Sequence, residues 1–361
     1  DFIIAENDIG DWMQSAFIET ENGDVLNDSI YRRNSIVEEL YNVNIKGFKI
    51  EGERNRQDLA QLKNVILAGD KDYDVAFIPG SLCATMFSDP SYLVPLSDVS
   101  TLDLTHSWWA QDSVDTMTFG GKTISATGDM VVTTTGSSTV TLFNKALANQ
   151  YDLDVYSVVL DGKFTVDYVY DTAKLVSADL NGDTKADASD RYGVTFGDMN
   201  KYLGFIKAFD IDMFRKTSSG YEFAYDSERA SDAVSKLCQF INDNENTQVA
   251  FGNDDTHPEY QISTGGGNYA SKIFTDGRAL FSFGLIADAA TIVPSIDFSY
   301  GLLPYPKWDE TQENYGTMLQ RSCYALIPVT VEDKDAAGAV LEALSSESYR
   351  TLVPEYCEVS L

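Results

Sequence analysis

Residues 44–80, NIKGFKIEGERNRQDLAQLKNVILAGDKDYDVAFIPG, decide the fold. The first part, NIKGFKIE, predicts a strand, and DVAFIPG at the end predicts a buried strand followed by a Pro-Gly turn. Between them, Leu59, Leu62 and Ile66 recur at helical spacing, and Gly69 supplies a stop. A strand, a helix and a strand over this length predict parallel strands joined by a right-handed crossover.

The same alternation continues on both sides of this unit. Toward the N-terminus, FIIA (2–5) predicts a strand, and NDSIYRRNSIVEELYN (27–42) predicts a helix with Asn27 and Asp28 as cap candidates. One face of that helix has the apolar side chains Ile30, Val37, Leu40 and Tyr41. Toward the C-terminus, further helices and strands are predicted from TVDYVYDTAKLVSAD (165–179), YGVTF (192–196), DSERASDAVSKLCQFIND (226–243) and RALFSFG (278–284).

A Thr/Ser/Gly-rich stretch, TTTGSST at 133–139, interrupts the alternation and predicts a crossing between two lobes. We therefore expect an α/β fold of two lobes, each a mostly parallel sheet flanked by helices. The expected segments are lobe 1 at 1–132, the crossing at 133–139, lobe 2 at 140–296, a return to lobe 1 at 297–330, and C-terminal helices at 331–361.

Composition excludes several classes of protein. The chain has 361 residues, 43% of them hydrophobic, which is typical of a globular protein. Its net charge of -30, without any basic run, argues against nucleic acid and anionic lipid as partners. No window approaches the roughly 18 to 20 apolar residues of a membrane span. The four cysteines have no CxxC spacing, so we expect separate buried thiols rather than a zinc or redox site.

The stretch DLNGDTKADASD, residues 179–190, concentrates oxygen-bearing side chains in one loop. Like charges this close repel unless a cation lies among them. With Asp179 as position 1, the oxygen donors fall at positions 1, 3, 5, 9 and 12 of an EF-hand-type calcium loop, and the position 7 carbonyl is also available. The predicted Ca²⁺ ligands are therefore Asp179, Asn181, Asp183, the carbonyl of Lys185, Asp187 and Asp190.

Two positions of this loop depart from the EF-hand pattern. Position 6, usually glycine, is Thr184, and the glycine stands at position 4 as Gly182. Position 12 is Asp190 instead of glutamate. These features resemble the calcium loops of dockerin modules. The alternative is a solvated Asn/Asp-rich turn that binds no ion.

Several quoted segments resemble, in order, the extracellular solute-binding proteins of family 1, the sugar-binding receptors of ABC importers. The segments span nearly the whole chain: NDSIYRRNSIVEELYNVNI, DYDVAFIPG, LFNKALANQYDL, DGKFTVDYVYDTAKLVSADLNGD, DGRALFSFG, SYGLLPYPKWDETQENYGT and EALSSESYRTLVPEYCEVSL. The resemblance implies a two-lobed, type II periplasmic-binding-protein-like fold that closes on its ligand at a hinge. By the same analogy, the calcium loop belongs to lobe 2 and is structural.

The resemblance also implies where the protein works and with what. Such proteins are exported, are commonly lipid-anchored in Gram-positive bacteria, and deliver a saccharide to a membrane permease. We therefore expect an extracellular monomer that captures an oligosaccharide in the cleft between its lobes. The chains of this family normally run further, so we expect the C-terminal helices to be incomplete here and a signal peptide to precede Asp1.

Ligands of open α/β sheets bind at the carboxyl ends of strands. Sugar pockets combine aromatic faces with carboxylates and amides that bind hydroxyl groups. Candidates with these properties follow the predicted strands or lie near the crossing, although each could equally be a core or surface residue. They are Trp12, Asp11, Ser81, Asp129, Tyr202, Phe283, Trp308 and Tyr315. Closure on a ligand would require contacts from both lobes, such as Trp12 and Tyr202.

Two other functions stay open at this point. A glycoside hydrolase needs only two suitably spaced carboxylates, and the chain has 56 acidic residues. A calcium-dependent carbohydrate-binding module is the second alternative, although such modules are usually all-β. The two histidines lie in no metal-ligand motif, and no nucleophile elbow or phosphate-binding loop is present, so we do not expect an enzyme of those classes.

Overall fold

The computed structural model describes residues 1–7, 16–50, 57–87, 89–196, 200–217, 220–225, 227–243, 245–249, 269–292, 296–320 and 322–360. Contacts divide the chain into two compact units. Unit 1 comprises Asp1–Ser137 and Arg321–Leu361, and unit 2 is the continuous segment Ser138–Gln320. The first crossing lies inside the expected segment 133–139. The second lies at 320/321, so residues 297–320 belong to unit 2 and do not return to the first lobe.

Unit 1 contains a five-stranded sheet in the order β2-β1-β3-β14-β4. β1 is parallel to both β2 and β3, which places the two strands of the opening quotation on either side of it. β14 is antiparallel to β3 and to β4. The strands are β1 (Phe2–Asn7), β2 (Ile45–Ile50), β3 (Val75–Pro79), β4 (Leu93–Val94) and β14 (Cys323–Pro328).

Helices flank this sheet, and α1 differs from the prediction at both ends. Asp24, and not Asn27 or Asp28, caps α1, because its carboxylate accepts hydrogen bonds from the Leu26 and Asn27 backbone N–H groups. Near the other end, Leu40 is 64% exposed instead of buried. The helices of unit 1 are α1 (Val25–Tyr41), α2 (Gln57–Ala68), α3 (Gly80–Phe87), α4 (Gln111–Thr116), α5 (Thr133–Gly136), α13 (Lys334–Glu347) and α14 (Val353–Glu355); β5 (Thr118–Phe119) and β6 (Lys122–Thr123) form a small hairpin.

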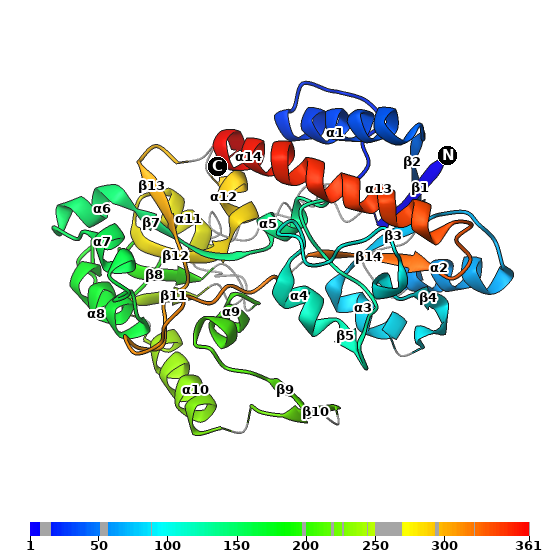
Figure 1. The fold of residues 1–361 in the computed structure, drawn as a ribbon. Coiled ribbons are helices and arrows are strands. Elements are labelled where there is room, and N and C mark those ends of the chain that lie inside the picture. Colours follow the sequence, from blue (N-terminus) through cyan, green and yellow to red (C-terminus); the bar gives the residue numbers. More distant parts are fainter. Residues whose placement is uncertain are drawn as a thin grey trace. The chain divides into compact units, whose positions relative to one another are not determined.

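The C-terminal helix packs beside α1 (Figure 1). It continues from α13 through a π-helical segment, Ser348–Leu352, then α14, then a second π-helical segment, Tyr356–Ser360. Pro354 lies between the two segments and has no N–H to donate to the preceding turn, which favours this departure from regular α-helix.

Unit 2 contains a second five-stranded sheet, in the order β11-β8-β12-β7-β13. β8 is parallel to β11 and β12, whereas β7 is antiparallel to β12 and β13. Both sheets are therefore mixed, but four of the five strands in each point the same way and only β14 or β7 runs opposite, which confirms the expectation of mostly parallel sheets. β7 and β14 are the first strands after each crossing, so neither needs a helical crossover within its own sheet. The strands are β7 (Thr139–Asn144), β8 (Tyr192–Phe196), β11 (Thr247–Val249), β12 (Ala279–Leu285) and β13 (Tyr300–Leu303).

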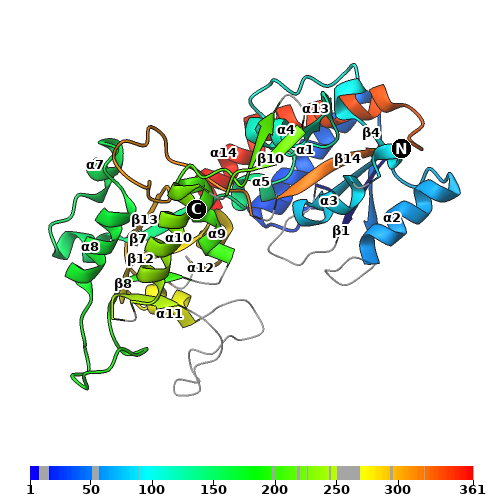
Figure 2. The same cartoon turned by 90° about the horizontal axis from the view of Figure 1, so that it is seen from below.

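The helices of unit 2 confirm the predicted amphipathic segments. In α8, Val166, Val169, Ala173 and Val176 are buried, and Thr165 caps the first turn. α7 and α8 lie side by side in both views (Figures 1 and 2). A separate two-stranded hairpin, β9 (Phe214–Thr217) with β10 (Gly220–Phe223), follows α9. The helices are α6 (Lys145–Gln150), α7 (Val155–Leu160), α8 (Val166–Val176), α9 (Asn200–Ala208), α10 (Glu228–Ile241), α11 (Tyr269–Thr275) and α12 (Ile286–Ile292).

Candidate functional site

Three predicted ligand residues cannot be placed by their side chains. Asp11 and Trp12 lie outside the described residues, and the side chain of Ser81, the third, is not described. The backbone of Ser81 lies in the first turn of α3, directly after β3. The preceding residue is glycine, and a Cβ at Gly80 would lie 2.8 Å from the Tyr324 ring, so a side chain there would require that ring to move. The position of Ser81 after a strand therefore agrees with the sequence analysis, while its contacts stay a prediction.

Asp129 lies in unit 1 on a tight backbone arrangement. Its N–H donates to the Trp108 carbonyl at 2.9 Å, and Trp109 pairs with Gly128 in an isolated antiparallel bridge. Any side chain at Gly128 would collide with this neighbour, because its Cβ would lie 2.3 Å from the Trp108 carbonyl oxygen. Glycine thus permits the close approach that fixes the direction of Asp129.

The Asp129 carboxyl is half-buried, and its burial raises its pKa to about 6. No hydrogen bond from another described residue to this carboxylate offsets the loss of solvation. Hydrogen bonds donated by a ligand would stabilise a carboxylate in such surroundings, and sugar hydroxyl groups can donate them. Asp129 is therefore the predicted ligand residue in unit 1 whose surroundings most favour an added hydrogen-bond partner.

A cluster of buried hydroxyl groups, which the sequence analysis missed, lies next to Asp129. Thr127 Oγ1 lies 2.7 Å from both Thr134 Oγ1 and Ser322 Oγ, and Thr134 Oγ1 donates to the Gly128 carbonyl at 2.7 Å. Cys323 N–H donates to Thr133 Oγ1 at 3.3 Å. These bonds fasten the unit 1 ends of both crossings to each other. The only signal in the sequence was the Thr-rich composition of 133–139.

Tyr202 and Phe283 both contact Phe196 in unit 2, but they differ in how deeply they are buried. Phe283 is 1% exposed and stacks on Phe196 with ring centroids 4.9 Å apart. Phe283 is therefore a core residue, and its prediction as a ligand contact is corrected, because β12 is the central strand of its sheet and is buried along its whole length. Tyr202, on α9, is half-buried, with its ring 4.6 Å from Phe196. The Tyr202 ring therefore lies at the edge of the unit 2 core, which holds it in place.

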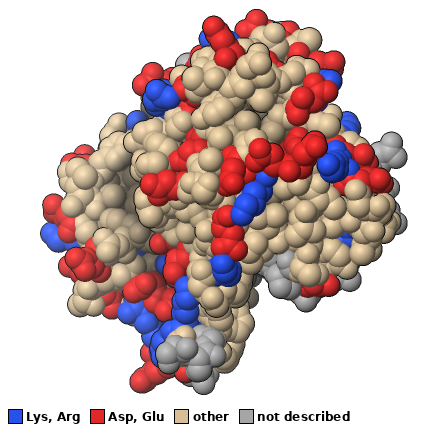
Figure 3. Space-filling view, turned by 45° about the vertical axis from the view of Figure 1, so that its right-hand side comes forward, with Lys and Arg blue, Asp and Glu red and all other residues tan. Residues whose placement is uncertain are grey.

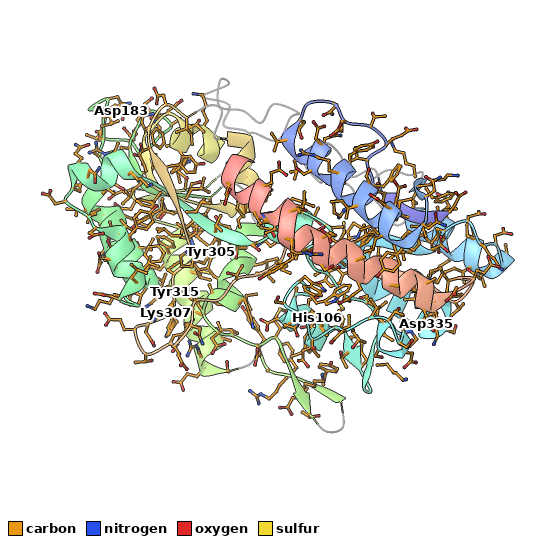
Figure 4. The ribbon with its side chains drawn as sticks, turned by 45° about the horizontal axis from the view of Figure 1, so that its top comes forward. His106, Asp183, Tyr305, Lys307, Tyr315 and Asp335 are labelled. Carbon is orange, nitrogen blue, oxygen red and sulfur yellow. The ribbon has the colours of Figure 1, made fainter. Side chains whose placement is uncertain are left out.

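Trp308 and Tyr315 lie on one strap, residues 304–316, together with a buried lysine. Figure 4 shows Tyr305, Lys307 and Tyr315 gathered in unit 2. Tyr315 donates to the Val159 carbonyl at 2.9 Å, and the Lys307 ammonium lies 5.2 Å from its ring centre. The Lys236 ammonium lies 4.4 Å from the centre of the Trp308 ring. Both rings thus have structural contacts, and their roles as ligand contacts stay predictions.

In the acidic loop 179–190, backbone N–H groups bind the carboxylates. Asp179 accepts from Gly182 N–H at 2.7 Å and from Thr184 N–H at 2.9 Å, which lowers its pKa. Asp190 accepts from Leu180 N–H at 2.9 Å. Thr184, at the position usually held by glycine, has φ 65. In the described part of the chain no three acidic, histidine or cysteine side chains converge on a metal position, so the calcium ligands stay a prediction.

The loop nevertheless has the chemistry that a hard cation requires. Its side-chain donors are all oxygens of carboxylate or amide groups, which Ca²⁺ prefers in flexible geometry. The positive φ of Thr184 supplies the sharp turn at position 6 without glycine. Asp183 lies at the surface of unit 2 (Figure 4).

The histidine and cysteine positions give no catalytic arrangement among the described residues. His106 Nδ1 lies 2.7 Å from Glu342 Oε1, and the same carboxylate accepts hydrogen bonds from the indole N–H groups of Trp108 and Trp109. This contact holds the loop before α4 against α13. Of the cysteines, Cys83 and Cys323 are buried, but Cys238 and Cys357 are exposed on helices, which corrects the expectation of four buried thiols.

Two mixed α/β units, connected by two crossings, form the two-lobed fold that the sequence predicts. The model of the bacterial extracellular solute-binding proteins matches residues 43–351. The chain belongs to this family. Its members are solute receptors of transport systems, which sets aside the glycoside hydrolase alternative. No curated protein sequence matches the chain.

Solved structures of low sequence identity share the fold. A cyclo/maltodextrin-binding protein complexed with maltotetraose has a TM-score of 0.63 at 13% identity, covering 99% of this chain and 77% of that one. UspC of Mycobacterium tuberculosis has a TM-score of 0.62 at 14% identity, with 96% and 78% covered. The GacH receptor of Streptomyces glaucescens, solved unliganded and with acarbose, has a TM-score of 0.58 at 15% identity, with 99% and 82% covered.

The described residues also show whether a helix could cross a membrane and how charge is distributed at the surface. No helix among them is long and apolar enough to cross a membrane. Acidic side chains are spread over the face shown in Figure 3, in keeping with the net charge of -30.

Proposed function

We propose that this protein captures an oligosaccharide outside the cell and delivers it to the permease of an ABC importer. The observation that supports this function is the family match over residues 43–351. Maltotetraose and acarbose, the ligands named for two structures of the same fold, favour a saccharide over other solutes. Asp129 and Tyr202 are the described side chains that we propose to contact it, together with Trp12, Asp11 and Ser81.

Asp129 and Tyr202 would contact different parts of a sugar, because one is a carboxylate and the other an aromatic ring. The Asp129 carboxylate accepts hydrogen bonds from sugar hydroxyl groups, which compensates for its burial. The Tyr202 ring offers a face to the C–H surface of a pyranose, held at its edge position by Phe196. Ligand binding couples the two units only if each contributes contacts, since a ligand shifts a conformational equilibrium through its differential affinity for the two states.

We further propose a monomer exported to the cell surface and held there by a lipid anchor of the Gram-positive type. The family description supports an extracellular location. Size-exclusion chromatography with light scattering tests the monomer, because a dimer would double the measured mass. Detergent phase partitioning of the protein from its native host tests the anchor, because an unlipidated protein would stay in the aqueous phase.

A structural Ca²⁺ in the loop 179–190 is the remaining part of the proposal. Support comes from the oxygen donors at positions 1, 3, 5, 9 and 12 and from the turn at Thr184. The ion would neutralise part of the negative charge that this loop concentrates.

Thermal denaturation with added solutes tests the saccharide function. The panel contains monosaccharides, linear and cyclic oligosaccharides, peptides and glycerophosphodiesters, and each mixture is analysed afterwards for cleavage products. A ligand that binds only the native state raises Tm in proportion to the logarithm of its concentration once it exceeds Kd. We expect this rise with one class of oligosaccharide and no products.

The other outcomes have distinct meanings. Cleavage of the sugar would restore the glycoside hydrolase alternative. A rise of Tm with peptides or glycerophosphodiesters alone would keep the solute-binding function and replace its ligand class. Replacing Asp129 and Tyr202 in turn then tests whether either side chain contributes to the affinity that is measured.

A further inference from the structure

The β9–β10 hairpin presents aromatic side chains on a single face. Its antiparallel register places Phe223 opposite Phe214 and Tyr221 opposite Lys216. Because side chains alternate along a strand, these four residues share one face of the hairpin. We call them the aromatic face. Arg215 and Glu222 occupy the opposite face and form an ion pair at 3.2 Å.

The rings of the aromatic face are largely in water. Phe214 is 60% exposed, Phe223 58% and Tyr221 44%. The two phenyl rings contact each other edge to face, with centroids 6.0 Å apart, and neither belongs to the core of unit 2. A two-stranded hairpin has little stability of its own, so exposing three aromatic rings on one is unfavourable unless a partner covers them.

The base of the hairpin is nevertheless firmly held. Ile211, just before β9, is buried in the unit 2 core, and its N–H donates to the Ile206 carbonyl at 2.9 Å. Ala224, just after β10, donates to the Met213 carbonyl at 3.0 Å. The hairpin therefore extends from the end of α9, the helix that also contains Tyr202 (Figure 1). Its face is positioned by the same helix as a proposed ligand contact.

The charges favour a neutral, hydroxyl-rich occupant. With a net charge of -30, the chain is repelled by anionic surfaces and by a second copy of itself. Among the described residues of the two strands the one carboxylate is that of Glu222, which lies on the other face with Arg215, so these residues offer a cationic partner no ion pair on the aromatic face. The polar groups on the aromatic face are the Tyr221 hydroxyl and the Lys216 ammonium, both able to bind hydroxyl oxygens.

We propose that the aromatic face of the β9–β10 hairpin is a carbohydrate-contact surface on which rings of an oligosaccharide stack. Phe214 and Phe223 lie against the C–H faces of the sugar, and Tyr221 and Lys216 bind its hydroxyl groups. The inference rests on the proposed saccharide function and specifies it: the ligand is long enough to reach beyond the contacts near Tyr202. The surface therefore selects for chain length.

The test compares sugars of different length on variants of the complete chain. The variants are Phe214→Ala/Phe223→Ala, Tyr221→Ala and, as the matched control, Leu160→Ala. Leu160 is 86% exposed in the same unit but lies on α7. Titration calorimetry uses two series of linear sugars, maltose to maltoheptaose and cellobiose to cellohexaose. Near-ultraviolet circular dichroism and Tm check that each variant is folded.

We expect the double Phe variant to bind the longest sugars about tenfold more weakly while keeping its affinity for the shortest sugar that binds. Tyr221→Ala has a smaller effect of the same kind, and Leu160→Ala has none. Unchanged affinity of the double variant at every length would remove the hairpin from the ligand site. An equal loss at every length would also overturn the proposal, since it would show a general disturbance.

Two further outcomes separate this inference from the proposed function. If the parent protein binds no sugar of either series but binds another sugar of the thermal-denaturation panel, the lengths are compared with that sugar. If it binds no sugar at all, the proposed saccharide ligand fails, and the hairpin inference fails with it. If sedimentation shows a parent dimer that the double Phe variant dissociates, a second copy occupies the aromatic face and the carbohydrate surface is wrong.

Discussion

Burial raises the pKa of the Asp129 carboxyl to about 6, so at neutral pH the carboxylate is ionised although burial makes its charge less favourable than in water. The native state consequently binds more protons than the unfolded state between pH 3.8 and about 6. The free energy of unfolding therefore decreases as pH rises through this window. Such an unfavourable charge is typical of residues kept for function.

Asp129→Asn removes the charge and retains the shape, so it should change stability and binding in opposite directions. At pH 7 and above, we expect the variant to be more stable by about 1 to 2 kcal/mol, a value reduced for the solvent at a half-buried site. The gain shrinks as pH falls toward 4. Oligosaccharide affinity falls about tenfold. Urea denaturation across pH, with calorimetric titration of the sugar, measures both quantities. A variant that loses stability at pH 7 would contradict this account.

Arg33 gives a second prediction at the residue scale. Its guanidinium is fully buried, and burial lowers its pKa to about 10. It donates to the carbonyls of Ala16 at 2.6 Å and Met130 at 2.8 Å and to Ser348 Oγ at 2.9 Å. These bonds join α1, the chain after β1, the residue after Asp129 and the C-terminal helix.

Replacing Arg33 by methionine removes these hydrogen bonds from buried acceptors, of which the Ala16 carbonyl keeps the Asn34 side-chain amide as a donor at 3.2 Å. We expect the free energy of unfolding to fall by about 3 to 5 kcal/mol in urea denaturation. Arg32→Met is the matched control, because Arg32 is the neighbouring residue of α1, with its side chain 55% exposed. The control should change stability by less than about 0.5 kcal/mol. Equal effects of the two substitutions would mean that the buried bonds add nothing to stability.

At the scale of elements, the acidic loop between α8 and β8 gives the third prediction. Added Ca²⁺ should raise Tm by about 5 °C or more at a hundredfold excess over Kd, and chelation should reverse the rise. Asp183→Asn should weaken this response, because it removes one charge while its amide oxygen can still accept from Lys185 N–H, as Asp183 does at 2.8 Å. The response also disappears in acid, where the carboxylates are protonated.

The control for the loop is Asp171→Asn on α8. This residue is also acidic and exposed, with its carboxylate 2.9 Å from the Lys174 ammonium, but it lies outside the loop. Its calcium response should equal that of the parent. A parent protein whose Tm does not respond to Ca²⁺ would leave the loop as a solvated turn.

Elements also show how far sequence reasoning reaches. Periodicity located α2, α8 and α10 well, because the apolar face of a helix is formed by residues close together in the sequence. It could not show that the side chain of Phe283, at the end of β12, points into the core, because that depends on which strands lie beside it. The exposed rings of β9 and β10 were missed for the same reason: an aromatic residue in a strand usually predicts burial.

At the scale of the whole molecule, the two-lobed organisation follows from the alternation of strands and helices, and the family match agrees with it. The second crossing could not be located in this way. Residues 300–303 form β13 against β7, a pairing between segments far apart in sequence and without a local signal. Antiparallel strands that arrive from the other unit likewise have no signature distinguishing them from parallel ones.

The position of the second crossing gives the last prediction, that residues 138–320 fold alone. Both ends of this segment are fastened together: Thr139 N–H donates to the Met318 carbonyl at 3.1 Å, and Ser138 pairs with Leu319. Its core includes Tyr305, which packs against Phe283 with ring centroids 4.9 Å apart. We expect cooperative thermal unfolding of the fragment by circular dichroism, within the usual size of a domain.

The fragment 140–296, cut at the boundary expected from the sequence, is the matched comparison. It lacks β13 and Tyr305, so it exposes one edge of β7 and opens the core beside Phe283. The loss of a buried aromatic side chain alone costs about 3 to 5 kcal/mol, a large part of the stability of a domain. This fragment should therefore be non-cooperative or aggregated. If both fragments unfold with the same cooperativity and Tm, the strand and strap at 297–320 are not integral to unit 2, and the boundary belongs where the sequence placed it.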